Sequence, residues 1–138
     1  MQPGVLSLTG FLGTDRRNLA DILEADAREV ARLNVTHEQI ADRLATLVRC
    51  GLDGLETEVV CETDYRVRHH GARGRIPCPW GHLGIYEKGD VHLTRISTGE
   101  SVIVSELQVH LIRTHGFYQG KGSPYRLEPA TLKRLLDL

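Results

Sequence analysis

The spacing of apolar residues changes once near the middle of this chain, and that change sets the fold class. Up to about residue 55, apolar side chains recur every three or four positions, as in helices that bury one face. Beyond residue 58, apolar and polar residues alternate, as in strands that are half buried in a sheet. The sequence therefore predicts an α+β fold, with an N-terminal helical hairpin followed by a small antiparallel sheet and C-terminal helices.

The first predicted helix covers residues 15–34, with Thr14 or Asp15 as its N-cap and a stop at Asn34. Its apolar stripe has spacings of three and four and consists of Leu19, Ile22, Leu23, Ala27, Val30 and Leu33. The short connection after it predicts that the next helix returns antiparallel to it.

The second predicted helix begins after Thr36, where Thr36 and Gln39 form a capping-box pattern, and it is expected to end at Gly51. Ile40, Leu44, Leu47 and Val48 make up its apolar face. Both helices are thus expected to bury one side.

The strand-rich part begins with one predicted strand over residues 59–70. In this strand Val59, Cys61, Tyr65 and Val67 share the buried face. Residues 84–96 predict two short strands that turn at residues 88–90, and residues 102–104 predict another strand. A helix is expected between an N-cap at Ser105 and Gly116, and a last helix is expected to start at Pro129.

The length of 138 residues, with 41% apolar and 25% charged residues, is typical of one soluble domain over residues 1–138. Within it, residues 1–55 form the hairpin part and residues 56–138 the strand-rich part. A chain of this size can bury an ordinary core, so folding does not require a metal.

The three cysteines and the character of the first residues predict the compartment. The start of the chain has no basic segment followed by a long apolar one, and no apolar run is long enough to span a membrane. An odd number of cysteines without a secretion signal predicts reduced thiols in a cytoplasmic protein. We therefore expect Cys50, Cys61 and Cys78 to be free thiols, and we expect no membrane contact.

Four residues have the types and intervals of a zinc site. Cys78 and His82, separated by three residues, lie in a turn that contains prolines and a glycine. His110 and His115, separated by four residues, lie on the predicted helix. Zinc binds sulfur and imidazole nitrogen in a tetrahedron, often from one turn and one helix. The sequence therefore predicts a zinc ion bound by these four residues.

This order of turn pair, strands and helix pair resembles an enlarged ββα zinc finger over residues 78–115. Two features depart from that family: a histidine replaces the second cysteine, and 27 residues separate the two pairs, about twice the usual interval. The resemblance implies metal binding and says little about DNA reading.

The helical pair needs a local distortion to share one ion. Five positions rotate by about 140° beyond a full turn of an ideal helix. A change in winding at the helix end before Gly116 would bring His110 and His115 together. If one of the four ligands is not used, His69, His70, His92 and Cys61 are the alternatives, and Cys61 is the weakest because it faces the core.

Coordination number decides what such a zinc ion would do. Four protein ligands make a closed, structural site, which we expect here. Three ligands would leave room for a reactive water, and Glu87 or Glu106 would then be the general base of a small metal-dependent hydrolase.

Basic residues gather in the second part of the chain. Residues 1–58 carry a net charge of −4 and residues 59–138 a net charge of +3. Residues 66–75 are rich in arginine, residues 115–126 are rich in glycine, and neither stretch contains an acidic residue. Together they predict a nucleic-acid surface made of Arg66, Arg68, Arg73, Arg75, Lys121 and Arg126. Aromatic residues in 117–125 could stack on bases, which favours single-stranded RNA as the ligand.

These observations predict a small cytosolic zinc-binding protein that acts as an interaction module for single-stranded nucleic acid or a protein partner. The competing hypotheses are the metal-dependent hydrolase and a metal-free protein whose helical hairpin forms a homodimer.

Overall fold

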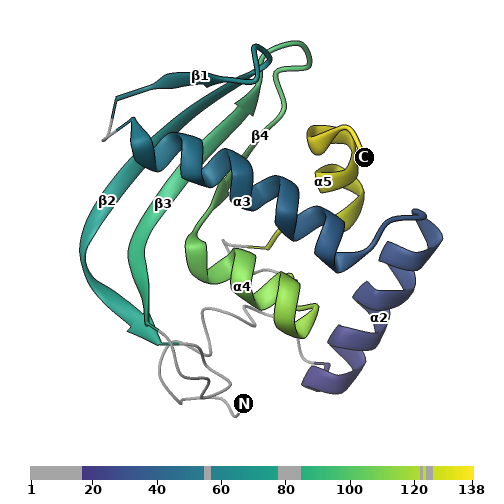
Figure 1. Ribbon diagram of the computed structural model, residues 1–138. Helices are drawn as coiled ribbons and strands as arrows, with labels where there is room; N and C mark the ends of the chain where they lie inside the picture. Colours follow the sequence, from purple (N-terminus) through teal and green to yellow (C-terminus); the bar gives the residue numbers. More distant parts are fainter. Residues whose placement is uncertain (1–16, 55–56, 78–84, 122, 124–125) are drawn as a thin grey trace.

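The computed structural model describes residues 17–54, 57–77, 85–121, 123 and 126–138, and only the backbone of residues 71–77 and 85–89. Over these residues four helices and one antiparallel sheet form a mixed α+β fold, which confirms the predicted class (Figure 1). The helices lie before and after the sheet in the sequence. The four strands follow one another in the order β1-β2-β3-β4, so each pairs with its neighbour in the chain.

The first described helix, α2 (Leu19–Arg32), starts later than the sequence predicted. Its N-cap is Asn18, whose side chain accepts a hydrogen bond of 2.9 Å from the backbone of Asp21. The helix ends where expected, because Asn34 has a positive φ of 60°. The N-cap is therefore Asn18 and not Thr14 or Asp15, as the sequence predicted, because the Asn18 side chain satisfies a backbone N–H of the first turn.

The second helix, α3 (His37–Asp53), confirms the capping box but extends beyond the expected end. The Thr36 and Gln39 side chains each accept a hydrogen bond from the other residue's backbone. Gly51 lies inside the helix, where a Cβ atom would come within 2.4 Å of a Val67 methyl group. This glycine allows α3 to approach the sheet closely instead of ending the helix.

The single strand predicted for residues 59–70 is a hairpin. It consists of β1 (Val59–Cys61) and β2 (Tyr65–Pro77), joined by a turn in which Glu62 and Thr63 have positive φ. Cys61 pairs with Tyr65 across the turn, so both still face the core as the alternation predicted. Alternation alone could not reveal this turn, because it contains neither glycine nor proline.

Two strands predicted for residues 84–96 are one continuous strand, β3 (Ile85–Arg95). The expected turn residue Gly89 pairs with Gly71 of β2, so it lies within the ladder. The pairing shifts between Gly71 and Arg75, which marks an irregularity in this long two-stranded ribbon. The turn after β3 and the strand β4 (Ser101–Val104) occur as predicted, with Gly99 at a φ of 74°.

The helix α4 (Glu106–His115) confirms its predicted ends. Ser105 and Gln108 form a capping box, and Gly116 ends the helix with a φ of 61°. The last helix, α5 (Pro129–Leu136), begins with the expected proline. None of these helices, among the described residues, is long and apolar enough to cross a membrane.

Helix α3 is the centre of the packing. It lies across one face of the sheet and contacts both α4 and α5, while α2 makes its main contacts with α5 (Figure 1). The fully buried apolar residues come from all four helices and from the inner faces of the strands; they include Ile22, Ile40, Leu44, Leu47, Val67, Leu93, Ile112, Leu132 and Leu135. The opposite face of the sheet carries exposed polar side chains together with the exposed apolar residues Val60 and Ile103, which pair with Arg66 and His92.

A disulfide joins α3 to β1, which contradicts the prediction of free thiols for two of the three cysteines. The sulfur atoms of Cys50 and Cys61 are bonded across a sequence separation of 11 residues. Because disulfides persist mainly in oxidising compartments, the cysteine content no longer supports a cytoplasmic location. Cys61 is thereby removed from the alternative metal ligands.

Candidate functional site

The two predicted helical metal ligands lie close together on α4, His110 in the middle of the helix and His115 at its last residue. The ring centroids of His110 and His115 are 5.5 Å apart, with the rings nearly perpendicular. Nδ1 of His110 is 3.4 Å from the Thr114 hydroxyl. Two imidazoles that share a zinc ion have centroids about 5 Å apart, because each bound nitrogen is about 2 Å from the ion. The five-residue interval is therefore compatible with a shared ion.

The other two predicted ligands, Cys78 and His82, lie outside the described residues. Within the described part of the chain, no three histidine, cysteine or acidic side chains are grouped so that they could hold a metal ion. The four-ligand zinc site therefore remains a prediction, and the His110–His115 pair is the portion of it that the structure describes.

Two of the alternative ligands form a separate pair on the sheet. His70 of β2 and His92 of β3 have ring centroids 4.2 Å apart and are both exposed. They lie on the face of the sheet away from α3, so they belong to a different surface from His110 and His115. His69, the remaining alternative, alternates with them and is half buried.

The outer face of the sheet gathers several of the predicted nucleic-acid-binding residues. Arg66 and Arg68 alternate along β2 with the buried Tyr65 and Val67, so their side chains point outward and are exposed. Arg68 pairs with His92, and Arg66 with Thr94 of β3. A shallow groove of about 180 Å³ runs between these side chains and is lined by Glu58, Arg66, Arg68, His70, His92 and Thr94.

Two further predicted arginines are on the extension of the same strand. Arg73 and Arg75 belong to β2, and Arg75 pairs with Glu87 of β3 in the backbone ladder. Their side chains lie outside the described part of the structure. Lys121, after α4, is described and exposed.

Arg126, also predicted to contact nucleic acid, is engaged inside the protein. Its side chain is 9% exposed, and two of its N–H groups bind both oxygens of the buried Asp26 at 2.6 and 2.8 Å. Two more bind Glu128, and the fifth binds the backbone carbonyl of Gln119. All five donors are therefore used, so this guanidinium is not available to a phosphate.

Burial and ion pairing oppose each other at this cluster. Burial disfavours the charged guanidinium, but the hydrogen bonds that it donates to Asp26 and Glu128 outweigh this effect and raise the pKa of Arg126. The same contact with Arg126 lowers the pKa of Glu128. This ion pair was not predicted, although Asp26 falls in the middle of the apolar stripe between Ile22 and Val30. A carboxylate at such a position needs a buried partner.

Two of the three aromatic residues expected to stack on bases are part of the core, and the third, Tyr125, lies outside the described residues. Phe117 and Tyr118 are each 1% exposed. The Tyr118 hydroxyl lies 2.7 Å from Nδ1 of His37, the first residue of α3. Burial lowers the pKa of His37, although the charge of Asp26 acts in the opposite direction. Burial and the charge of Asp26 both raise the pKa of Tyr118. The pair therefore links α3 to the segment after α4 in its uncharged form.

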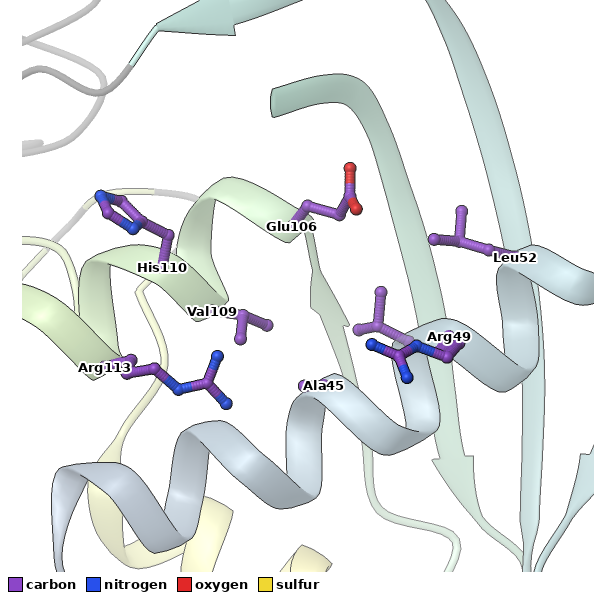
Figure 2. Close-up of a pocket in the computed structure, with 8 residues that line it drawn as sticks. Ala45, Arg49, Leu52, Glu106, Val109, His110 and Arg113 are labelled. Atoms are coloured by element: carbon purple, nitrogen blue, oxygen red, sulfur yellow. The ribbon is translucent and has the colours of Figure 1, made fainter. Parts of the chain in front are cut away.

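A third feature is a groove of about 310 Å³ between α3 and α4 (Figure 2). It is lined by Ala45, Val48, Arg49 and Leu52 of α3 and by Glu106, Val109, His110 and Arg113 of α4. Glu106, one of the two bases considered for a hydrolase, thus borders the same groove as His110. The side chain of the other, Glu87, is outside the described residues.

Comparison of the chain with known protein families, with curated protein sequences and with solved structures gives no match. The function must therefore be argued from the surfaces described above.

Proposed function

We propose that this protein is an interaction module that binds single-stranded nucleic acid on the outer face of its sheet. The observation that carries the proposal is the cluster of Arg66, Arg68, His70 and His92, whose exposed side chains surround one groove. We refer to these four residues as the outer-face cluster.

Arginine and strand geometry explain how this surface would contact a phosphate backbone. Alternate residues of a strand project from the same face about 7 Å apart, so Arg66 and Arg68 present two guanidinium groups in a row. Each planar guanidinium can donate two parallel hydrogen bonds to one phosphate. The continuing strand adds Arg73 and Arg75 to the same segment of sequence.

The histidine pair supplies a surface for bases. The rings of His70 and His92 are in contact and exposed, and histidine is among the side chains on which unpaired RNA bases stack. Base stacking is tolerant of sequence, because every base has an aromatic face. A single strand is favoured over a duplex, since the longest helix, α3, is packed against the inner face of the sheet and cannot enter a groove.

Fluorescence anisotropy with a labelled oligouridine tests this proposal directly. The Arg66→Ala, Arg68→Ala double variant is expected to bind at least about tenfold more weakly, because two charge-assisted contacts are lost. Its dependence of log affinity on log salt should be shallower by about 1.4, since each lost contact to a single strand contributes about 0.7. Both side chains are exposed, so the fold should be unaffected.

The matched control is the Arg28→Ala, Arg32→Ala variant, which removes the same charge from exposed positions on α2. It should bind the oligonucleotide like the parent protein. Equal affinity of the outer-face variant and the parent, at low and moderate salt, would refute the proposal.

The neighbouring arginines make a second expectation. Replacing Arg73 and Arg75 by alanine should also weaken binding of the oligonucleotide and leave the melting temperature nearly unchanged. If binding is unchanged, the surface is limited to the outer-face cluster.

Zinc binding by Cys78, His82, His110 and His115 is our second proposal, and the short distance between the His110 and His115 rings favours it. With all four ligands bound, zinc would join the segment between β2 and β3 to the end of α4, and its role would be structural. With three bound, the ion would retain a water, and Glu106 is the described candidate for a general base.

Elemental analysis of the purified protein tests the metal proposal. We expect about one zinc per chain, as for a four-ligand structural site. The metal should be lost in Cys78→Ser and in His110→Ala, His115→Ala, and retained in His70→Gln, His92→Gln. A metal-free preparation whose stability and spectrum do not change on adding zinc would rule out the site. X-ray absorption spectroscopy would then count the ligands and separate the structural from the catalytic role.

A further inference from the structure

The groove between α3 and α4 is separate from the outer-face cluster and combines apolar with charged residues. Its lining residues are spaced by three or four positions on both helices, so two stripes face each other across it. The apolar part consists of Ala45, Val48, Leu52 and Val109, of which Val48 and Val109 are almost completely buried. The groove therefore has an apolar floor with charged residues at its sides.

Two arginines enter the groove from opposite helices. In Figure 2 the guanidinium groups of Arg49 and Arg113 point from α3 and α4 into the space between the helices. Within the described part of the chain, the side chain of Arg49 makes no hydrogen bond or ion pair. Arg113 binds Asp42 at 2.6 Å, but both side chains are substantially exposed, with 43% and 62% of their surface accessible. Such an exposed pair is weak and can be exchanged for another anion.

We propose that this groove binds a small amphipathic monocarboxylate. The carboxylate would lie between Arg49 and Arg113, and the apolar body would cover Ala45 and Leu52, the two apolar lining residues that are only half buried. An anion at this position would accept hydrogen bonds from both guanidinium groups. The volume of about 310 Å³ is at the small end of the range for ligand pockets.

Glu106 limits the kind of acid that fits. Its carboxylate lines the same groove, so it disfavours a second negative charge on the ligand. A phosphate ester or a dicarboxylate is therefore a poorer match than an acid with one carboxylate and an uncharged chain.

Isothermal titration calorimetry with octanoate on the full-length chain tests this site. Octanoate should bind saturably, whereas acetate, which lacks the apolar chain, and octanamide, which lacks the charge, should bind much more weakly. The Arg49→Gln, Arg113→Gln variant is expected to lose at least about tenfold in affinity, because both charged partners of the carboxylate are removed. Ala45→Leu, which fills the floor of the groove without changing charge, should also reduce the affinity.

The matched controls separate this site from the others. Arg28→Gln, Arg32→Gln on α2 and Arg66→Ala, Arg68→Ala on the sheet should bind octanoate like the parent. Equal binding of octanoate and octanamide, or unchanged affinity in Arg49→Gln, Arg113→Gln, would overturn the proposal. Loss of binding in the presence of EDTA would place the carboxylate on a metal ion and would overturn it as well.

Discussion

Arg126 is a buried charged residue that depends on partners from distant parts of the chain. A buried guanidinium is tolerated only when its charge is balanced and its donors are satisfied, and here Asp26, Glu128 and one backbone carbonyl do both. Asp26 comes from α2 and Arg126 from the segment before α5, so the pair ties together two parts separated by 100 residues. Removing one partner leaves the other buried charge partly uncompensated.

Replacing Asp26 by alanine should therefore lower the free energy of unfolding by about 3 kcal/mol, as expected for breaking a buried ion pair. The control is Glu24→Ala, which breaks the exposed ion pair with Arg28 on the same helix and should leave the free energy of unfolding nearly unchanged. Urea denaturation of the three proteins measures both values. A similar decrease in the free energy of unfolding for the two variants would show that the buried pair contributes no more stability than the exposed one.

His37 predicts how stability depends on pH. Its pKa in the folded protein is lowered by burial, so the unfolded chain binds a proton more readily than the folded one. This contribution is fully present above the ordinary histidine pKa of about 6.5 and is lost as the pH falls below it. Carboxylates such as Glu128, whose pKa is also lowered, lose their contribution only below about pH 4.5.

We expect the urea midpoint of the parent to fall between pH 7.5 and pH 5.5, and the fall to be smaller in His37→Gln, because glutamine does not titrate. His92→Gln, at an exposed position, should keep the pH dependence of the parent. A His37→Gln variant with the full pH dependence would show that another group is responsible.

At the scale of the elements, helix ends and turns were predicted well where the local chemistry is decisive. The capping boxes at Thr36 and Ser105, the glycine after α4 and the proline that starts α5 all depend on residues within one turn of the helix end. The predicted helix end at Gly51 and the predicted turn at Gly89 were wrong, because contacts with a distant strand determine the local structure there. Gly51 remains helical because β2 packs against it, and Gly89 remains in a strand because β2 pairs with it.

Gly116 is constrained both by its backbone and by a distant neighbour. Its φ is 61°, and a Cβ atom there would lie 2.8 Å from Nε2 of His37. Gly99 has a similar φ of 74°, but a Cβ atom would meet no heavy atom within 4 Å. The two glycines thus separate the backbone effect from the packing effect.

Gly99→Ala should cost about 1 kcal/mol, the penalty for placing a side chain on a left-handed residue. Gly116→Ala should cost about 1–3 kcal/mol more, because the histidine ring must move. In a His37→Ala background the difference between the two substitutions should shrink, which thermal or urea denaturation of the double variants would show. A difference that persists would contradict the steric explanation.

At the scale of the whole molecule, the disulfide joins the end of the central helix to the edge of the sheet. It closes a loop that includes residues 55–56 and connects the helical and strand-rich parts of the chain. Such a bond stabilises the fold mainly by restricting the unfolded chain.

Reduction should lower the free energy of unfolding by about 3 kcal/mol, which is the chain-entropy estimate for a loop of this size. The Cys50→Ala, Cys61→Ala variant should be destabilised and should no longer respond to reductant. Thiol titration of the denatured, unreduced protein should find one thiol per chain, from the remaining cysteine. Three titratable thiols would show that the bond is not formed.

The candidate sites could be predicted from the sequence only where they depend on local structure and not on contacts between distant residues. Arg66 and Arg68 could be placed on one exposed face because strand alternation is local, and the structure confirms that placement. The sequence alone could not distinguish the buried Arg126 from these exposed arginines, because its burial depends on Asp26, 100 residues away. The groove between α3 and α4 has no local signal, since its two arginines come from helices that only the fold brings together.

The sequence by itself determined that two helices precede a strand-rich part and two further helices, most helix ends, and the inward or outward direction of the strand residues, because these follow from periodicity and from capping within a few residues. The tertiary structure decided which cysteines pair, which arginine is buried, and that His110 and His115 approach each other despite an unfavourable interval. Those outcomes depend on contacts between distant segments, and packing selects such contacts only when the whole chain is folded.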